Sequence, residues 1–137
     1  MSAEKNMAIA RNFLEAAWRK RDFGSLSKYV AQNHVAHGPF TAQLPPGIQG
    51  VRAFASTFVT AFPDVTYTID SQEADGELVR TQVTYHGTQT AELMGIAATG
   101  RQATVPVLIT DRIVDGKIVE TWAEWDPDDM MRQLGVS

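Results

Sequence analysis

The chain has no cysteine among its 137 residues. This absence excludes disulfide bonds, thiolate nucleophiles and metal sites built on cysteine sulfur, and it fits a protein of the cytosol. Histidine is scarce as well, with 3 residues in the whole chain. His34 and His37 have the spacing of a metal-binding pair, but carboxylates would have to complete the ligand set. We therefore expect no metal.

Long apolar runs and basic clusters are also missing. No stretch approaches the roughly 20 apolar residues that cross a bilayer, and Met1 leads into a polar, helix-like segment instead of an apolar signal region. The net charge is −4, and the longest basic cluster is Arg19-Lys20-Arg21, at the expected end of a helix. Phosphate-binding loops, nucleophile elbows and dinucleotide fingerprints are absent too. We expect one cytoplasmic domain over residues 1–137, without nucleic-acid or membrane partners.

Helical periodicity runs through the first half of the chain. Apolar residues recur at helical spacing between Ala3 and Lys20, and a short second helix is expected over Leu26–Val30. The third helix, Val51–Ala61, carries phenylalanines four residues apart that end with Phe62. Such an aromatic stripe is more typical of a core than of a cofactor site.

The segment between the second and third helices is irregular. His34–Phe40 predicts a brief extended stretch that Gly38 and Pro39 stop, with His34 a surface loop residue. Residues 41–49 contain Pro45-Pro46-Gly47 and predict a loop at the rim or lid of a pocket.

From Val65 onward the apolar period changes from 3.6 to 2. Strands are expected over Val65–Asp70, Leu78–His86 and Thr88–Gly95, followed by a long hairpin, and a short helix should close the chain over Pro127–Leu134. Three helices followed by four or five antiparallel strands predict an α+β fold. In such a fold a curved sheet wraps onto the helices and makes a cone with a pocket inside.

The hairpin, Val105–Asp126, carries the best catalytic candidate. Asp115-Gly116 is a strong two-residue turn signal, and it predicts that Asp111 lies opposite Glu120 and Ile109 opposite Trp122. Asp111 shares the face of its strand that should be buried, where burial would raise its pKa and suit it to acid/base chemistry. A different register, or a salt bridge to Arg112 or another arginine, would explain the same residue without catalysis.

Several sequence motifs resemble the SnoaL-like polyketide cyclase family of the nuclear-transport-factor-two-like superfamily. They are His37-Gly38-Pro39, Gly50-Val51-Arg52, Phe62-Pro63-Asp64, Gly87-Thr88, Thr99-Gly100-Arg101 through Asp111-Arg112-Ile113, Asp115 through Glu120, Trp122 and Asp126. The resemblance implies a cone-shaped α+β barrel, usually a homodimer formed through the outer sheet surface. It also implies cofactor-free intramolecular aldol chemistry, in which the acid/base carboxylate corresponds to Asp111.

One position departs from the family pattern. Many members have Gly-Thr-His where this chain has Gly87-Thr88-Gln89. A glutamine forms hydrogen bonds but does not move a proton. Some relatives in polyketide pathways are cofactor-independent hydroxylases.

Aldol chemistry needs a base for a proton next to a carbonyl, and hydrogen-bond donors for the enolate that forms. We predict Asp111 and His37 as the catalytic residues, with Asp111 as the base and with His37, Gln89 or Tyr85 as the alternatives for the donor. Trp122 should point inward and stack on a flat substrate, although ordinary core packing would explain it as well. Glu120 would pair with Asp111, or lie solvated near the sheet end. The expected substrate contacts are Trp122, Gln89, Glu120, Tyr85, Phe58 and Phe40.

Three functional hypotheses remain at this point. The first is a cofactor-independent cyclase, isomerase or hydroxylase that acts on a small hydrophobic, carbonyl-bearing substrate. The second is a non-catalytic module that holds a small ligand in the same pocket. The third is a protein-interaction subunit that uses its outer sheet.

Overall fold

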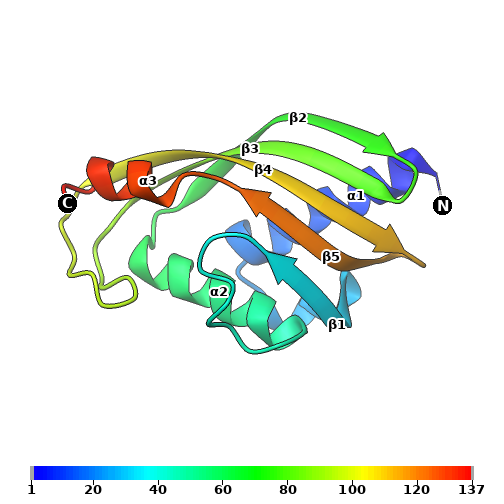
Figure 1. Ribbon diagram of the computed structural model, residues 1–137, viewed down its shortest axis with the longest axis horizontal. Coiled ribbons are helices and arrows are strands. Elements are labelled where there is room, and N and C mark those ends of the chain that lie inside the picture. Colours follow the sequence, from blue (N-terminus) through cyan, green and yellow to red (C-terminus); the bar gives the residue numbers. More distant parts are fainter. Residues whose placement is uncertain (1, 137) are drawn as a thin grey trace.

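The computed structural model describes residues 2–136 and shows an α+β fold with one curved sheet (Figure 1). The helical elements are α1 (Ala3–Leu14), which continues as the π-helix η1 (Glu15–Arg19), the 3-10 helix η2 (Phe23–Lys28), α2 (Ile48–Ala61) and α3 (Pro127–Gln133). The strands are β1 (Val30–His37), β2 (Thr66–Asp75), β3 (Leu78–Thr88), β4 (Gln102–Val114) and β5 (Lys117–Glu124).

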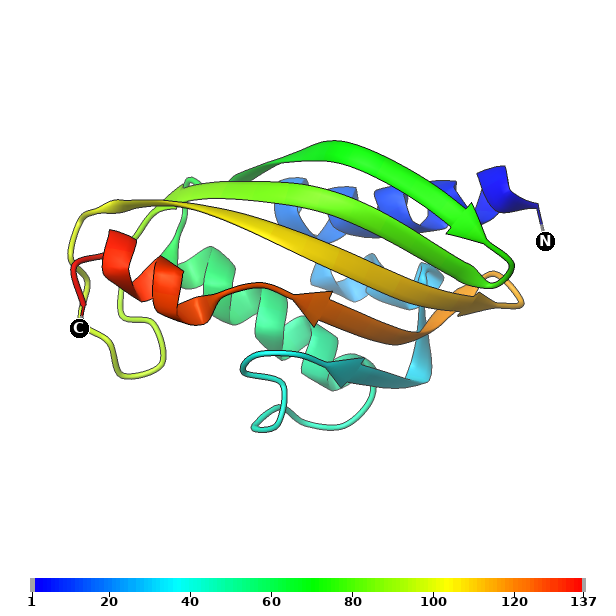
Figure 2. The same ribbon diagram turned by 45° about the horizontal axis from the view of Figure 1, so that its top comes forward.

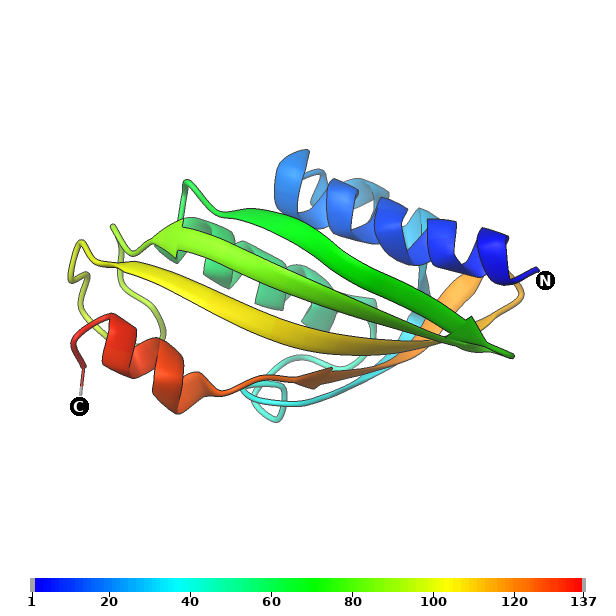
Figure 3. The ribbon, with the colours of Figure 1, turned by 90° about the horizontal axis from the view of Figure 1, so that it is seen from above.

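The sheet has the strand order β1-β5-β4-β3-β2. β1 pairs with β5 in parallel, and the other neighbours are antiparallel. The sheet curls over α2, and α1 lies against the same side near β2 and β3 (Figures 2 and 3). The predicted α+β cone is therefore confirmed, with the helices on the concave face of the sheet.

Apolar side chains on the predicted helix and strand faces form the core. Ala10, Leu14 and Ala17 from the first helix are at most 2% exposed, and they pack against Val79 and Val83 of β3. The Ser2 hydroxyl accepts a hydrogen bond from the Lys5 backbone N–H and so caps α1. This packing fixes the helices against the sheet and leaves space between α2 and the strands.

Two predicted elements differ in the structure. Residues 89–101 form a loop with a single Leu93–Ile96 bridge, so the strand expected over Thr88–Gly95 is wrong. The chain leaves the sheet here because Gln89 is buried and bonds this loop instead of a neighbouring strand. His34 is likewise wrong as a surface loop residue, since it lies in β1 and is 6% exposed.

The β4–β5 hairpin has the predicted turn but a shifted register. Asp115 and Gly116 both have positive φ, 51° and 79°, as a type I′ turn requires. Ile113 pairs with Ile118 as expected, but a bulge then leaves Val119 without a partner in the ladder. One extra residue moves every later side chain of β5 to the other face.

No helix within residues 2–136 has the length and apolar character needed to cross a bilayer.

Candidate functional site

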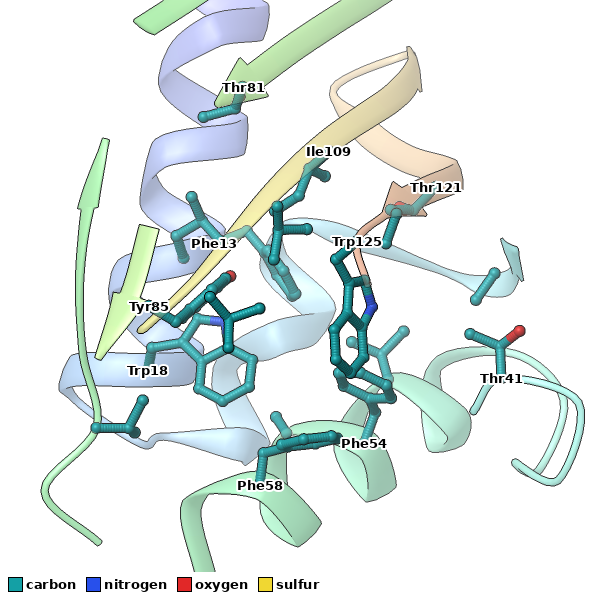
Figure 4. A pocket seen from close by; sticks show the side chains of 18 of the residues that line it. Phe13, Trp18, Thr41, Phe54, Phe58, Thr81, Tyr85, Ile109, Thr121 and Trp125 are labelled. Carbon is teal, nitrogen blue, oxygen red and sulfur yellow. The ribbon is translucent and has the colours of Figure 1, made fainter. Parts of the chain in front are cut away.

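The candidate site is a cavity of about 190 Å³ between the concave face of the sheet and α2. Phe54 and Phe58 of α2 lie on one side of it, and Trp18 and Tyr85 lie on another (Figure 4). The aliphatic side chains of β4, Ala103, Val105, Val107 and Ile109, form a further part of its wall. Among the described residues that line it, Asp111 is the only Asp, Glu, Lys or Arg.

Asp111 lies on β4 among the apolar residues that the alternation predicts. Val105, Val107 and Ile109 line the same cavity, and Asp111 itself is 4% exposed. Burial raises the pKa of Asp111 to about 7, and a hydrogen bond from Thr121 opposes part of that rise. No arginine pairs with this carboxylate within residues 2–136, because Arg112 bonds to Glu77 and Glu120 instead.

Thr121 and His34 extend the contacts of this carboxylate across two further strands. The Thr121 hydroxyl of β5 lies 2.7 Å from Oδ1 of Asp111 and 2.8 Å from Nε2 of His34 in β1. Burial lowers the pKa of His34 to about 4, with Glu120 opposing this shift and His37 adding to it. Neither Thr121 nor His34 was predicted as a site residue. The signal for His34 is strand alternation, which places His34 and His37, three residues apart, on opposite faces.

Tyr85 lines the cavity from β3, as predicted for a substrate contact. Its ring packs edge-on against Trp18, with centroids 5.2 Å apart, and points into the same space (Figure 4). Burial raises the pKa of the Tyr85 hydroxyl further above its ordinary value, and the charge of Asp111 adds to the rise. Tyr85 is therefore a neutral hydrogen-bond donor over the whole working range of pH.

The bulge at Val119 reverses the predicted faces of the residues that follow it, in β5 and just after it. Trp122 pairs with Thr110 and does not line the cavity, so its predicted inward position is wrong. Trp125, three residues further on, lines the cavity beside Phe54 and Phe58 (Figure 4). The cavity has an aromatic wall for a flat ligand, but Trp125 forms it in place of the predicted Trp122.

His37 and Glu120 meet on the outer face of the sheet. His37 Nε2 lies 2.6 Å from the Glu120 carboxylate, and its ring stacks on Trp122 with centroids 5.3 Å apart. Glu120 pairs with Arg112, and the His37 hydrogen bond lowers the pKa of this carboxyl. The predicted Asp111–Glu120 pair is therefore wrong. His37 belongs to the cavity rim, but its ring is engaged away from Asp111.

Gln89 is completely buried outside the cavity wall. Its amide nitrogen donates to the carbonyls of Ile96 and Ala97, and its oxygen accepts from the Thr99 hydroxyl. These bonds hold the loop between β3 and β4 in shape. Gln89 was expected to contact the substrate, but its amide group instead holds this loop, because all of its hydrogen bonds lie within the loop.

The two phenylalanines expected at the site have different positions. Phe58 lines the cavity as predicted. Phe40, with φ of 66°, does not line it but packs behind it, with its ring 6.4 Å from Phe58 and 5.6 Å from Trp125. Phe40 therefore supports two wall residues and is not itself part of the wall.

The described residues bring together no group of three or more side chains among His, Cys, Asp and Glu that could hold a metal ion. His34 and His37 do not form the metal pair that their spacing suggests, since they bond to Thr121 and to Glu120 on opposite faces of the sheet.

Comparison with known proteins identifies the relatives of this chain. The sequence description of the SnoaL-like polyketide cyclase family matches residues 8–134. No curated protein matches the sequence. IdmH from Streptomyces antibioticus, provisionally described as a polyketide cyclase, is 33% identical, with a TM-score of 0.80 over 96% of this chain and 99% of that one.

Two further solved structures have closely similar folds. TsrD from Streptomyces laurentii is 25% identical with a TM-score of 0.89, covering 100% of this chain and 99% of that one. AclR from Streptomyces galilaeus, provisionally described as a hydroxylase, is 24% identical with a TM-score of 0.83, covering 98% of each chain. The likeness to AclR concerns the fold.

Proposed function

Because the chain belongs to the SnoaL-like polyketide cyclase family, we propose that it is an acid/base enzyme acting on a neutral, hydrophobic molecule that carries a carbonyl group. Asp111 carries this proposal. It is a buried carboxyl with a pKa near 7, in a cavity whose described wall contains no other Asp, Glu, Lys or Arg. A carboxylate of that basicity accepts protons better than an exposed one and is still ionised in part at neutral pH.

The reaction that fits this site best is an intramolecular aldol cyclisation. Ionised Asp111 takes a proton from the carbon next to the carbonyl, and the electron pair of that C–H bond forms an enolate. The enolate carbon then bonds to a second carbonyl carbon of the same molecule. Protonated Asp111 returns its proton to the new alkoxide, which restores the enzyme. IdmH, with its provisional cyclase description, supports cyclisation over isomerisation or hydroxylation.

The Tyr85 hydroxyl is the donor that we assign to the enolate oxygen. It lines the same cavity, and its raised pKa keeps it protonated while negative charge develops on the substrate. A fixed neutral donor in an apolar cavity stabilises that charge more than water does. The chemistry needs no cofactor under this proposal, because the proton leaves and returns through one side chain.

The cavity limits the size and charge of the substrate. An apolar cavity of about 150 Å³ holds benzene in another protein, so the 190 Å³ cavity fits one substituted ring or a compact pair of rings. Its described wall offers no cationic side chain to an anionic substrate. We therefore propose a neutral one- or two-ring molecule with two carbonyl groups. We further propose that the protein is a cytoplasmic homodimer that pairs through its outer sheet face.

Deuterium exchange on simple ketones tests this function without knowledge of the natural substrate. The protein is incubated with 1-indanone and 2-tetralone in D₂O, and loss of the proton next to the carbonyl is followed by NMR. We expect faster exchange with the protein, and a loss of about 100-fold or more in Asp111→Asn, since general bases contribute about 10²–10⁴. Asp111→Asn keeps the size of the side chain, so ketone affinity should stay within threefold.

Two results would overturn the enzyme assignment. The first is a ketone that binds the unaltered protein without any faster exchange, which would favour the non-catalytic binding role. The second is equal exchange in the Asp111→Asn variant, which would remove Asp111 as the base. Glu73→Gln, at an exposed position of β2, serves as the matched control for a neutralised carboxylate.

A further inference from the structure

A chain of two hydrogen bonds links three neighbouring strands at the cavity wall. Oδ1 of Asp111 in β4 lies 2.7 Å from the Thr121 hydroxyl in β5, which lies 2.8 Å from Nε2 of His34 in β1. All three residues line the cavity, and Thr121 projects from β5 above it (Figure 4). His34 therefore reaches the candidate base through Thr121.

The single proton of the Thr121 hydroxyl fixes the direction of this chain. When Asp111 is ionised its oxygens only accept, so Thr121 donates to Oδ1. The hydroxyl then accepts from Nε2 of His34, which must carry the ring proton. His34 is thus required in the tautomer with a proton on Nε2 and a lone pair on Nδ1.

A histidine in the position of His34 is energetically unfavourable. Its Nδ1 atom is buried without a hydrogen-bond partner among the described residues. Such an unsatisfied group destabilises the folded state. Burial lowers the pKa of the His34 ring and keeps the ring neutral, although the charge of the Glu120 carboxylate raises this pKa in part. The ring of His37 is the other titratable group that shifts the pKa of His34, and it lowers that pKa further. The charge of Asp111 acts on Tyr85, whose pKa it raises. Buried polar groups without a hydrogen-bond partner are rare in proteins, and they occur mainly at functional sites.

We propose that His34 is a positioning residue for the reaction: its Nε2–H group holds the Thr121 hydroxyl against Oδ1 of Asp111 and leaves Oδ2 free to take the substrate proton. The idea rests on the proposed acid/base function of Asp111. It adds that His34 of β1 orients the base Asp111 through Thr121 of β5. Thr121 cannot turn away from Asp111 while His34 donates to its oxygen, so the carboxylate keeps one orientation toward the cavity.

The tautomer of His34 is the first test, and it uses the unaltered protein. Nitrogen-15 NMR of the histidine rings distinguishes a protonated Nε2 from a protonated Nδ1. At pH 9, where Asp111 is ionised, we expect the proton on Nε2 of His34. A proton on Nδ1 at that pH would overturn the proposal, whatever the activity of the protein.

Paired variants give the second test. Thr121→Val should raise the pKa of Asp111, measured by carboxyl carbon-13 NMR, by about one to two units, since it removes one hydrogen bond to a charged group. His34→Leu should raise it by a smaller amount, roughly half a unit by loss of hydrogen-bond cooperativity. His34→Gln and Thr121→Ser keep the donors and should leave the pKa within about 0.3 units.

Exchange kinetics on 2-tetralone separate positioning from simple stability. His34→Leu should lower kcat about tenfold at pH 9 with KM within twofold, and His34→Gln should restore most of the rate. An unchanged Asp111 pKa in both Thr121→Val and His34→Leu would contradict the proposal. If these shifts occur but the unaltered protein exchanges no ketone, the hydrogen-bond chain that orients Asp111 stands, and the proposed enzyme function fails together with the role of His34 in the reaction.

Discussion

Thr121 donates to Oδ1 of Asp111 across 2.7 Å, and within residues 2–136 it is the one side chain that hydrogen-bonds to this carboxylate. Two effects therefore act on Asp111 in opposite directions. Burial disfavours the charged form and raises its pKa, whereas the Thr121 hydrogen bond lowers it. Burial is the larger effect, and it brings the pKa to about 7.

The rate of ketone exchange should depend on the ionisation of Asp111. Because the carboxylate is the active form, kcat/KM should rise with pH, reach half its maximum near pH 7 and level off above it. The measurement is exchange of 2-tetralone between pH 5 and pH 9. Asp111→Asn should lack this rise. An inflection near pH 4 would mean that the group titrates as an exposed aspartate and would contradict the account.

The same pKa links Asp111 to stability. The folded state keeps the Asp111 proton up to about pH 7, while the unfolded state loses it near 3.8, so the contribution is full below 3.8 and is lost as pH rises to 7. Relative to Asp111→Asn, the unaltered protein should lose about 4 kcal/mol of unfolding free energy from pH 4 to 8, at about 1.36 kcal/mol per unit. Urea unfolding at each pH measures this. A difference that stays constant with pH would contradict it.

His34 should change stability with the opposite sign. Its folded pKa of about 4 lies below the unfolded value of 6.5, so its contribution is full above 6.5 and is lost as pH falls toward 4. His34→Leu should therefore remove an acid destabilisation of about 3 kcal/mol between pH 6.5 and pH 4. In the unaltered protein the two groups nearly cancel over this window. Urea unfolding at each pH measures this, and a difference between the two proteins that does not change with pH would contradict it.

The two tryptophans of the hairpin should differ in their effect on ligand binding. Trp125→Ala removes an aromatic wall of the cavity and should weaken binding of 2-tetralone about tenfold or more, from the lost apolar contact. Trp122→Ala, on the outer face, should change the affinity less than twofold. Isothermal titration calorimetry compares them. The reverse order would mean that the β5 register described above is wrong.

Gln89 should matter for the fold and not for proton transfer. Gln89→Leu leaves the carbonyls of Ile96 and Ala97 without their donor in a buried region, and should cost about 2 kcal/mol or more of unfolding free energy. The exchange rate of the folded variant should stay within threefold. Gln43→Leu, in the exposed loop before α2, is the control for an added leucine. A loss of exchange without a loss of stability would return Gln89 to the site.

The buried face of β4 could be predicted because the strand alternates without interruption. Asp111 has the same parity as Val105, Val107 and Ile109, so its position needed only the period of a strand. The α+β class followed in the same way, from the change of period near Val65. Local pattern was sufficient wherever the chain kept one period through an element.

The return strand could not be predicted because its bulge has no signature in the alternation. Val119 is an ordinary strand residue, yet its insertion moves Glu120 and Trp122 outward and Trp125 inward. His34 depended on a parallel pairing of β1 with β5, between segments more than 80 residues apart. Such a contact is set by the whole fold, so no local reading of residues 30–37 places it beside Thr121.

Titration of the Asp111 carboxyl carbon by carbon-13 NMR, with and without 2-tetralone, measures directly whether this group is an acid/base catalyst at neutral pH. We predict a pKa near 7 in the free protein, and a further shift when the ketone fills the cavity. Asp111→Asn removes the resonance and so assigns it. A pKa at or below the ordinary value of 3.8, unchanged by the ketone, would contradict the role of Asp111 as an acid/base group.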